Sequence, residues 1–200
     1  MTEYPWWQEV DAATPLMQGD LIEACPVTLF NETLDLADAD NLAGLLAELK
    51  TGVGIQTVRS IVMTQACDLA QRKVRNAILC PATKIEDFRK DWEEAFTRLK
   101  GHPAKPGAFG GQMNDIKTGR TMNYTLLSKR EPGDGVLLTT PTTIVDFHEV
   151  FSLPVAFLET WLRKTGERRL QLLPPYREHL SQAFARFFMR VGLPVDIKEL

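Results

Sequence analysis

Two short apolar runs in this chain end in side chains that can carry out chemistry. The run at 58–68 supplies a guanidinium, an amide, a thiol and a carboxylate, from Arg59, Gln65, Cys67 and Asp68. The run at 77–83 ends in the hydroxyl of Thr83. A guanidinium binds phosphate through two parallel hydrogen bonds, and a thiol becomes a nucleophile when a base activates it. Because both runs are rich in β-forming residues, we expect neighbouring strands to deliver these groups to one rim of a sheet.

Most of these residues also have an ordinary structural explanation. Arg59 could be a strand-end cation that pairs with a surface carboxylate. Thr83 precedes Lys84-Ile85-Glu86, which is the spacing of a capping box, so its hydroxyl could cap a helix that begins at Ile85. Asp68 could orient Arg59, or it could bond its own backbone amides in a turn. The sequence alone leaves each pair of explanations open.

The cysteines set limits on thiol and metal chemistry. Cys67 would need a basic partner to act as a nucleophile, and His148 is the candidate. The three cysteines cannot all pair within the chain, and no signal-peptide pattern precedes Trp6, so we expect free thiols in a reducing cytoplasm. Without a close Cys-x-x-Cys or His-x-x-x-His pair, we expect neither a metal site nor a cofactor. No apolar run approaches the roughly 20 residues that span a bilayer.

Composition indicates an ordinary globular chain. At 200 residues it can bury one core, and its hydrophobic and charged fractions of 44% and 24% are close to globular averages. The net charge of −3 gives no overall attraction for nucleic acid, but the charge is uneven along the chain. Residues 32–48 carry acidic charges only, whereas 163–190 are mostly basic. We interpret the basic region either as a solvated helix face or as a surface for phosphate or an acidic partner.

Local patterns predict an α+β chain. Strands are expected at 19–27, where Pro26 ends the pairing or marks an edge, at 55–64, 74–79 and 143–151, and in a hairpin of 122–127 with 136–140. Helices are expected around the leucine stripe Leu42, Leu45, Leu46 and Leu49, then at 85–99, 155–164 and 175–191. The helix at 85–99 should bury Phe88, Trp92, Ala95, Phe96 and Leu99. The Gly/Pro-rich segment 101–111 predicts a long mobile loop.

Several of these segments, in this order, match a known pattern. They are Gln18-Gly19-Asp20-Leu21-Ile22, Arg59 with Ile61-Val62-Met63, Ile78 to Thr83 with its Pro-x-Thr, Tyr124 to Ser128, Gly133 to Val136, and Ile144-Val145-Asp146. Together they resemble the PemK/MazF family of toxin endoribonucleases. The resemblance implies a small SH3-like antiparallel β-barrel in residues 1–153. Helical inserts at about 31–54 and 84–111, and a helical extension at 154–200 packed on the barrel, would then be additions to that barrel.

The resemblance also implies a function. In that family an Arg and a Thr serve in metal-independent cleavage of single-stranded RNA, so Arg59 and Thr83 are the catalytic candidates. Gln65, Cys67, Asp68 and His148 are the supporting or binding candidates. Attack of a ribose 2′-OH on the adjacent phosphate builds negative charge, which a guanidinium and a hydroxyl can stabilise. The expected setting is a bacterial toxin-antitoxin or phage-defence system.

A second hypothesis assigns the protein to a different functional class. The acidic total charge and the helical additions also suit a noncatalytic adaptor or assembly subunit, encoded near its partner protein. The last predicted helix is apolar on more than one face, which favours packing on two sides or contact with a partner. The partner-binding candidates are Arg177, Phe184, Phe188 and Arg190. A homo- or hetero-oligomer would fit this hypothesis.

Overall fold

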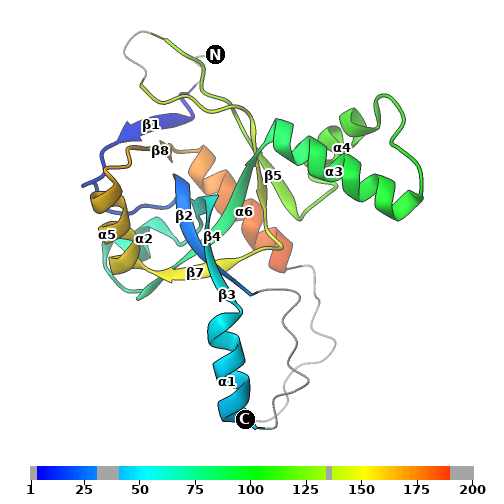
Figure 1. Cartoon of the computed structure of the whole chain (residues 1–200). Coiled ribbons are helices and arrows are strands. Elements are labelled where there is room, and N and C mark those ends of the chain that lie inside the picture. Colours follow the sequence, from blue (N-terminus) through cyan, green and yellow to red (C-terminus); the bar gives the residue numbers. More distant parts are fainter. Residues whose placement is uncertain (1–3, 31–40, 134–136, 190–200) are drawn as a thin grey trace, which may run out of the picture.

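The computed structural model describes residues 4–30, 41–133 and 137–189, and within them the chain is α+β, as predicted (Figure 1). The described strands are β1 (Trp7–Val10), β2 (Asp20–Phe30), β3 (Val53–Val62), β4 (Asn76–Lys84), β5 (Tyr124–Leu127), β6 (Thr143–Asp146), β7 (Phe151–Pro154) and β8 (Arg169–Leu172). The described helices are α1 (Leu42–Thr51), α2 (Ala66–Ala70), α3 (Ile85–Lys100), α4 (Ala108–Lys117), α5 (Val155–Thr165) and α6 (Tyr176–Phe188).

The strands form one antiparallel sheet in the order β1-β8-β2-β3-β4-β6-β5, and β7 pairs with the first half of β4. The end strands β1 and β5 do not pair with each other in the described part of the chain. β3 lies beside β4, with Ser60 opposite Pro81 and Ile61 opposite Cys80. The two apolar runs are therefore neighbouring strands, as the sequence predicts.

Both faces of the central strands are buried. Leu21, Ile61 and Cys80 belong to one hydrophobic cluster, and their chain neighbours Ile22, Val62 and Leu79 belong to another. Helix α6 covers the first cluster through Leu180, and α5 covers the second through Leu158 and Leu162. Because successive side chains point to opposite faces, burial on both faces explains why these strands read as continuous apolar runs. The first cluster also draws Trp7 from β1 and Leu127 from β5, so the sheet curls around it.

A buried ion pair joins β2 to β8. The Arg169 Nε donates to Asp20 Oδ2 at 2.7 Å, and neither side chain has any exposure. The remaining guanidinium nitrogens donate to the carbonyls of residues 11, 14 and 15. Gly19 permits the close approach of β8, because its φ is +82° and a Cβ there would lie 2.7 Å from the Leu172 Cβ. The interpretation of Arg169 as part of a basic surface is therefore wrong.

The segment 154–200 contains an unexpected strand. Its two predicted helices are confirmed as α5 and α6, but β8 lies between them and pairs with both β1 and β2. The strands predicted at 19–27, 55–64 and 74–79 are confirmed as β2, β3 and β4, with shifted ends. Pro26 lies opposite Thr57 of β3. At this position β3 is the only described strand that pairs with β2, because β8 pairs with β2 only at Asp20 and Leu21. Pro26 therefore marks an edge of the sheet, which is one of the two predicted alternatives.

Three predictions in the third quarter of the chain differ from the structure. β5 pairs with β6, and the segment predicted to be its partner forms only the isolated bridge between Arg130 and Thr140. The predicted strand at 143–151 divides into β6 and β7. The end of the predicted loop 101–111 lies inside α4, because Phe109 packs against Phe88 and Trp92 of α3.

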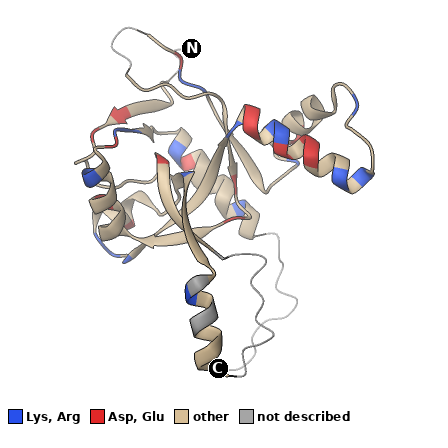
Figure 2. Ribbon diagram, in the orientation of Figure 1, with Lys and Arg blue, Asp and Glu red and all other residues tan. Residues whose placement is uncertain are grey.

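Helices α1 and α3 form as predicted but bury less than expected. α3 and α4 stand away from the sheet, and acidic and basic side chains are mixed along α3 (Figures 1 and 2). None of the α3 side chains is fully buried, and Leu99 is 77% exposed. α1 lies beyond the β2–β3 ribbon, and its Leu42 is 70% exposed. The part of the first insert at 31–40 lies outside the described residues.

Candidate functional site

Arg59 of β3 and Thr83 of β4 line the same open groove. The groove has a volume of about 420 Å³ and lies between these strands and the first turn of α3. Its remaining walls are formed by Glu23, Val58, Pro81, Ala82, Lys84, Asp87 and Glu149. The pairing of β3 with β4 brings the two side chains together, so the proximity expected from the sequence is present. We call this feature the Arg59 groove.

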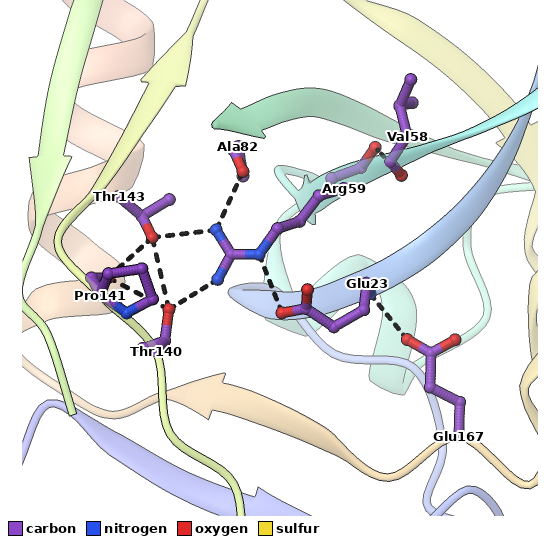
Figure 3. Close-up of polar contacts among 9 residues, drawn as sticks. Glu23, Val58, Arg59, Ala82, Thr140, Pro141, Thr143 and Glu167 are labelled. Atoms are coloured by element: carbon purple, nitrogen blue, oxygen red, sulfur yellow. Dashed lines mark hydrogen bonds and ion pairs between the residues drawn. The ribbon is translucent and has the colours of Figure 1, made fainter. Parts of the chain in front are cut away.

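The Arg59 guanidinium is bonded inside the protein (Figure 3). Its Nη1 donates to the Ala82 carbonyl and to the Thr143 hydroxyl, each at 2.9 Å. Its Nη2 donates to the Thr140 hydroxyl at 2.6 Å, and its Nε donates to Glu23 at 2.8 Å. The Arg59 side chain is only 10% exposed. A guanidinium has five N–H groups, so these four bonds leave one of them uncommitted.

Thr83 is a strand residue whose hydroxyl has no hydrogen-bond partner among the described residues. It lies in β4 opposite Ile144 of β6 and is half-buried. Lys84 occupies the N-cap position of α3, and its side chain forms no capping hydrogen bond. The backbone amide of Ile85 donates to the Thr142 carbonyl. The prediction that Thr83 caps this helix is therefore wrong. Its hydroxyl forms no hydrogen bond within the described part of the chain, so it can meet a ligand in the groove.

Carboxylates outnumber cations along the groove. Glu23, Asp87 and Glu149 face Arg59 and Lys84, and Arg59 is already paired with Glu23. The backbone amide of Glu23 donates a hydrogen bond to the Glu167 carboxylate at 2.7 Å. Burial raises the pKa of Glu167, and the backbone bond from Glu23 opposes that shift. Outside the Arg59–Glu23 pair, the lining holds two carboxylates, Asp87 and Glu149, and one cation, Lys84, while Asp87 also pairs with the exposed Lys90 at 3.4 Å. This small acidic excess in the lining favours a cationic ligand over a phosphate.

The other residues of the first run lie at a distance from this groove. Gln65, Cys67 and Asp68 belong to α2 and its start, near the first half of β4, where the Ile78 amide donates to the Thr64 hydroxyl. Thr83 is five residues further along β4, or roughly 17 Å at about 3.3 Å per residue. The exposed Cys67 thiol contacts Gln65 at 3.7 Å and Asp68 at 3.8 Å. Asp68 neither orients Arg59 nor bonds its own backbone amides, because its carboxylate contacts only the Cys67 thiol within the described residues.

His148 is not beside Cys67. Its ring contacts Asp146 at 3.2 Å, Asn123 at 3.4 Å, and the rings of Tyr124 and Phe187. The thiol–imidazole pair is therefore not formed. The other two thiols, Cys25 and Cys80, are buried, and burial raises the pKa of each to about 12. No group of three His, Cys, Asp or Glu side chains that could hold a metal ion occurs among the described residues.

The C-terminal candidates have different environments. Arg177 pairs with its neighbour Glu178, and Phe184 packs against Phe147 in the core. Phe188 is 56% exposed, while Arg190 lies outside the described residues.

Glu23, Thr140 and Thr143 are the side-chain partners of Arg59 that the sequence did not reveal. They lie 36, 81 and 84 positions from Arg59, and no local motif links them to it. The nearest signal was the expectation that Arg59 could pair with a carboxylate.

We found no family model, curated protein or solved structure that matches this chain. In the described segments, no helix is both long enough and apolar enough to cross a membrane.

Proposed function

We propose that this protein is a noncatalytic binding module and that the Arg59 groove holds a basic segment of a protein partner. The observation that carries the proposal is the commitment of the Arg59 guanidinium to four oxygens of its own chain. A guanidinium held in this way positions the ends of β3, β4 and β6 and offers little to an incoming phosphate. The partner-binding role then falls to the groups around it.

The charges of the groove support a cationic ligand. Glu23, Asp87 and Glu149 line one groove, where lysine or arginine side chains of a partner would find opposite charge. Each exposed ion pair contributes only about 0.2–1 kcal/mol. Binding should therefore need several such pairs and should weaken as salt is added.

The finer form of the fold is part of this proposal. We propose that the curled sheet is an SH3-like, PemK/MazF-like barrel whose last seam is joined by side chains. The Trp7 indole donates to the Ser128 carbonyl at 2.8 Å, and Glu9 accepts the amides of Leu137 and Leu138. These bonds connect β1 to the segment between β5 and β6, which is where the barrel would close.

The test is the binding of a fluorescein-labelled peptide with four lysines, measured by fluorescence anisotropy. The double variant Asp87→Asn, Glu149→Gln neutralises the groove and leaves the Arg59–Glu23 pair intact, so we expect clearly weaker binding. The matched control is Glu94→Gln, an exposed carboxylate further along α3. Equal affinity for the wild type and the double variant would contradict the proposal.

A second function is favoured by one observation, namely that Arg59 and Thr83 line the same open groove. In this alternative the protein binds and cleaves single-stranded RNA without a metal, in a toxin-antitoxin or phage-defence system. Thr83 would support the charge that builds on the phosphoryl oxygens. Wild-type protein should then cut RNA in EDTA, and Thr83→Val should not. Intact RNA after incubation with the wild type would reject this function.

The adaptor can also be tested at the C-terminal helix. Phe188 is the exposed aromatic residue of the candidate surface there. If the partner docks on α6, Phe188→Ala should weaken complex formation with the product of a neighbouring gene, measured by size-exclusion chromatography. If the partner docks in the groove, the Asp87→Asn, Glu149→Gln variant should weaken it instead.

A further inference from the structure

A second pocket, separate from the Arg59 groove, lies where the end of α4 and strand β5 meet α6. Its volume is about 280 Å³. Two cationic side chains line it, Lys117 from α4 and Arg186 from α6. Half of the other lining residues bear hydroxyl groups, namely Thr118, Thr121, Tyr124 and Thr125, and the other half are Ile116, Gly119, Met122 and Ala183. No Asp or Glu is among the described residues that line it, so its charge is opposite to that of the Arg59 groove.

Within the described part of the chain, both cations are without a partner for their side chains. Neither Lys117 nor Arg186 forms an ion pair or a hydrogen bond with another described residue. Asp115, which is the acidic residue nearest to Lys117 in the sequence, is already paired with Arg120 at 3.1 Å. The planar fork of Arg186 suits bidentate binding of a phosphate, and the Lys117 ammonium adds a mobile point charge.

The hydroxyl groups add neutral donors. The side chains of Thr121 and Thr125 form no hydrogen bond within the described residues, so both can donate to a ligand. Thr118 differs, since its hydroxyl donates to the Asn114 carbonyl at 2.8 Å. Burial raises the pKa of Tyr124, and the negative charges of Asp146 and Glu149 raise it further, which keeps its phenol protonated.

The Tyr124 ring is held in place by its neighbours. Phe88 packs against it edge-on at 5.1 Å between ring centroids, and His148 does so at 6.1 Å. A fixed aromatic ring beside cations and hydroxyls is the combination that binds a base together with its phosphate. The volume of the pocket is close to the lower end of the roughly 300–1,000 Å³ of small-molecule pockets, so it has room for at most one nucleotide.

We propose that this pocket binds one phosphate-bearing nucleotide, with Arg186 and Lys117 on the phosphate and Tyr124 beside the base. The nucleotide is either a free nucleoside monophosphate or one residue of a single strand of RNA. The site differs from the Arg59 groove in its residues and in the sign of its charge. It can therefore hold whether or not the groove binds a basic segment.

Calorimetric titration of the full chain with AMP, adenosine and inorganic phosphate tests the site. A fluorescein-labelled six-nucleotide RNA, followed by anisotropy, tests the second source. We expect AMP to bind at least tenfold more tightly than adenosine. Arg186→Ala and Lys117→Ala should each lower the affinity for AMP about tenfold, which is the effect of losing one charge-assisted hydrogen bond. Both side chains are exposed, so both variants should keep the wild-type melting temperature.

The matched control is Lys164→Ala, an exposed cation on α5 that also lacks a partner among the described residues. It should bind AMP as the wild type does. RNA binding much tighter than AMP, and lost in the same two variants, would identify a strand as the source, whereas AMP binding without RNA binding would identify the free nucleotide. Failure of both probes to bind, or equal binding by wild type and both variants, would overturn the proposal. The single variant Asp87→Asn changes the groove and lines no part of this pocket, so it should leave AMP binding unchanged, which separates this result from that of the groove.

Discussion

Replacing Arg59 tests whether its guanidinium is a structural clasp or a group kept for a ligand. The change is Arg59→Ala, which removes the bonds to the Ala82 carbonyl and to the hydroxyls of Thr140 and Thr143. A structural clasp predicts a large loss of stability. A side chain held for a ligand could be removed with little effect on the free energy of unfolding.

The size of the loss follows from the contacts. A hydrogen bond from a charged donor contributes about 1.5–3 kcal/mol net. The three internal bonds share one guanidinium, so their contributions do not add. The ion pair with the half-exposed Glu23 contributes less than about 1 kcal/mol. We therefore expect Arg59→Ala to lower the free energy of unfolding by about 3 kcal/mol, and the melting temperature by about 6–12 °C for a chain of this size.

Urea unfolding followed by tryptophan fluorescence measures this change. The control is Lys90→Ala on α3, whose ion pair with Asp87 is exposed on both sides and should cost less than about 0.5 kcal/mol. Combining Arg59→Ala with Thr143→Val should cost less than the sum of the two single changes, because both remove the same bond. An Arg59→Ala variant within about 0.5 kcal/mol of the wild type would refute the clasp.

Three further results are expected. Arg169→Met leaves the buried Asp20 charge without its partner and should cost about 3–5 kcal/mol in urea unfolding, so a loss below about 1 kcal/mol would contradict the role of this pair. The pKa of Glu9 is lowered below its ordinary 4.5, mainly by the hydrogen bond from the Leu138 amide. The folded state therefore favours the ionised carboxylate, so Glu9 stabilises the fold above pH 4.5 and loses this effect as the pH falls. Glu9→Gln should therefore be less stable than the wild type at pH 7, and in urea titrations the difference should shrink as the pH falls below 4.5, whereas a difference independent of pH would contradict this. Iodoacetamide at pH 8 should label Cys67 in the folded protein, but only after denaturation should it label Cys25 and Cys80; equal native rates for all three thiols would contradict their burial.

The sequence predicted elements whose pattern is local. β3 and β4 are continuous apolar runs, and the helices at 85–100, 155–165 and 176–188 carry clear periodicity. It failed where distant residues decide the structure. β8 was missed because Arg169 looks like a surface cation until Asp20, 149 positions away, pairs with it. Helix α4 was missed because packing of Phe109 against α3 overrides the low helix propensity of Gly110 and Gly111.

The candidate site was predictable in one respect only. Strand pairing places Arg59 near Thr83, and two successive apolar runs are enough to predict that pairing. The side chains that bind the Arg59 guanidinium are Glu23, Thr140 before β6 and Thr143 at the start of β6, and only the curled sheet brings them together. The nucleotide pocket around Arg186 likewise joins three elements that are distant in the chain. Sequence patterns reveal which side chains can react, but not whether a neighbour has already satisfied them.

The energy of the Arg59 network also limits what this residue can do for RNA. To hold a phosphate with both of its Nη groups, Arg59 would have to release oxygens that it now binds. If that release costs about 3 kcal/mol, the phosphate would bind more than a hundredfold more weakly than to a free guanidinium in the same place. The nearby carboxylates of Asp87 and Glu149 would weaken it further. Cleavage in this groove would therefore depend on Thr83 and the single uncommitted N–H of Arg59, and binding of a basic segment requires none of these bonds to break.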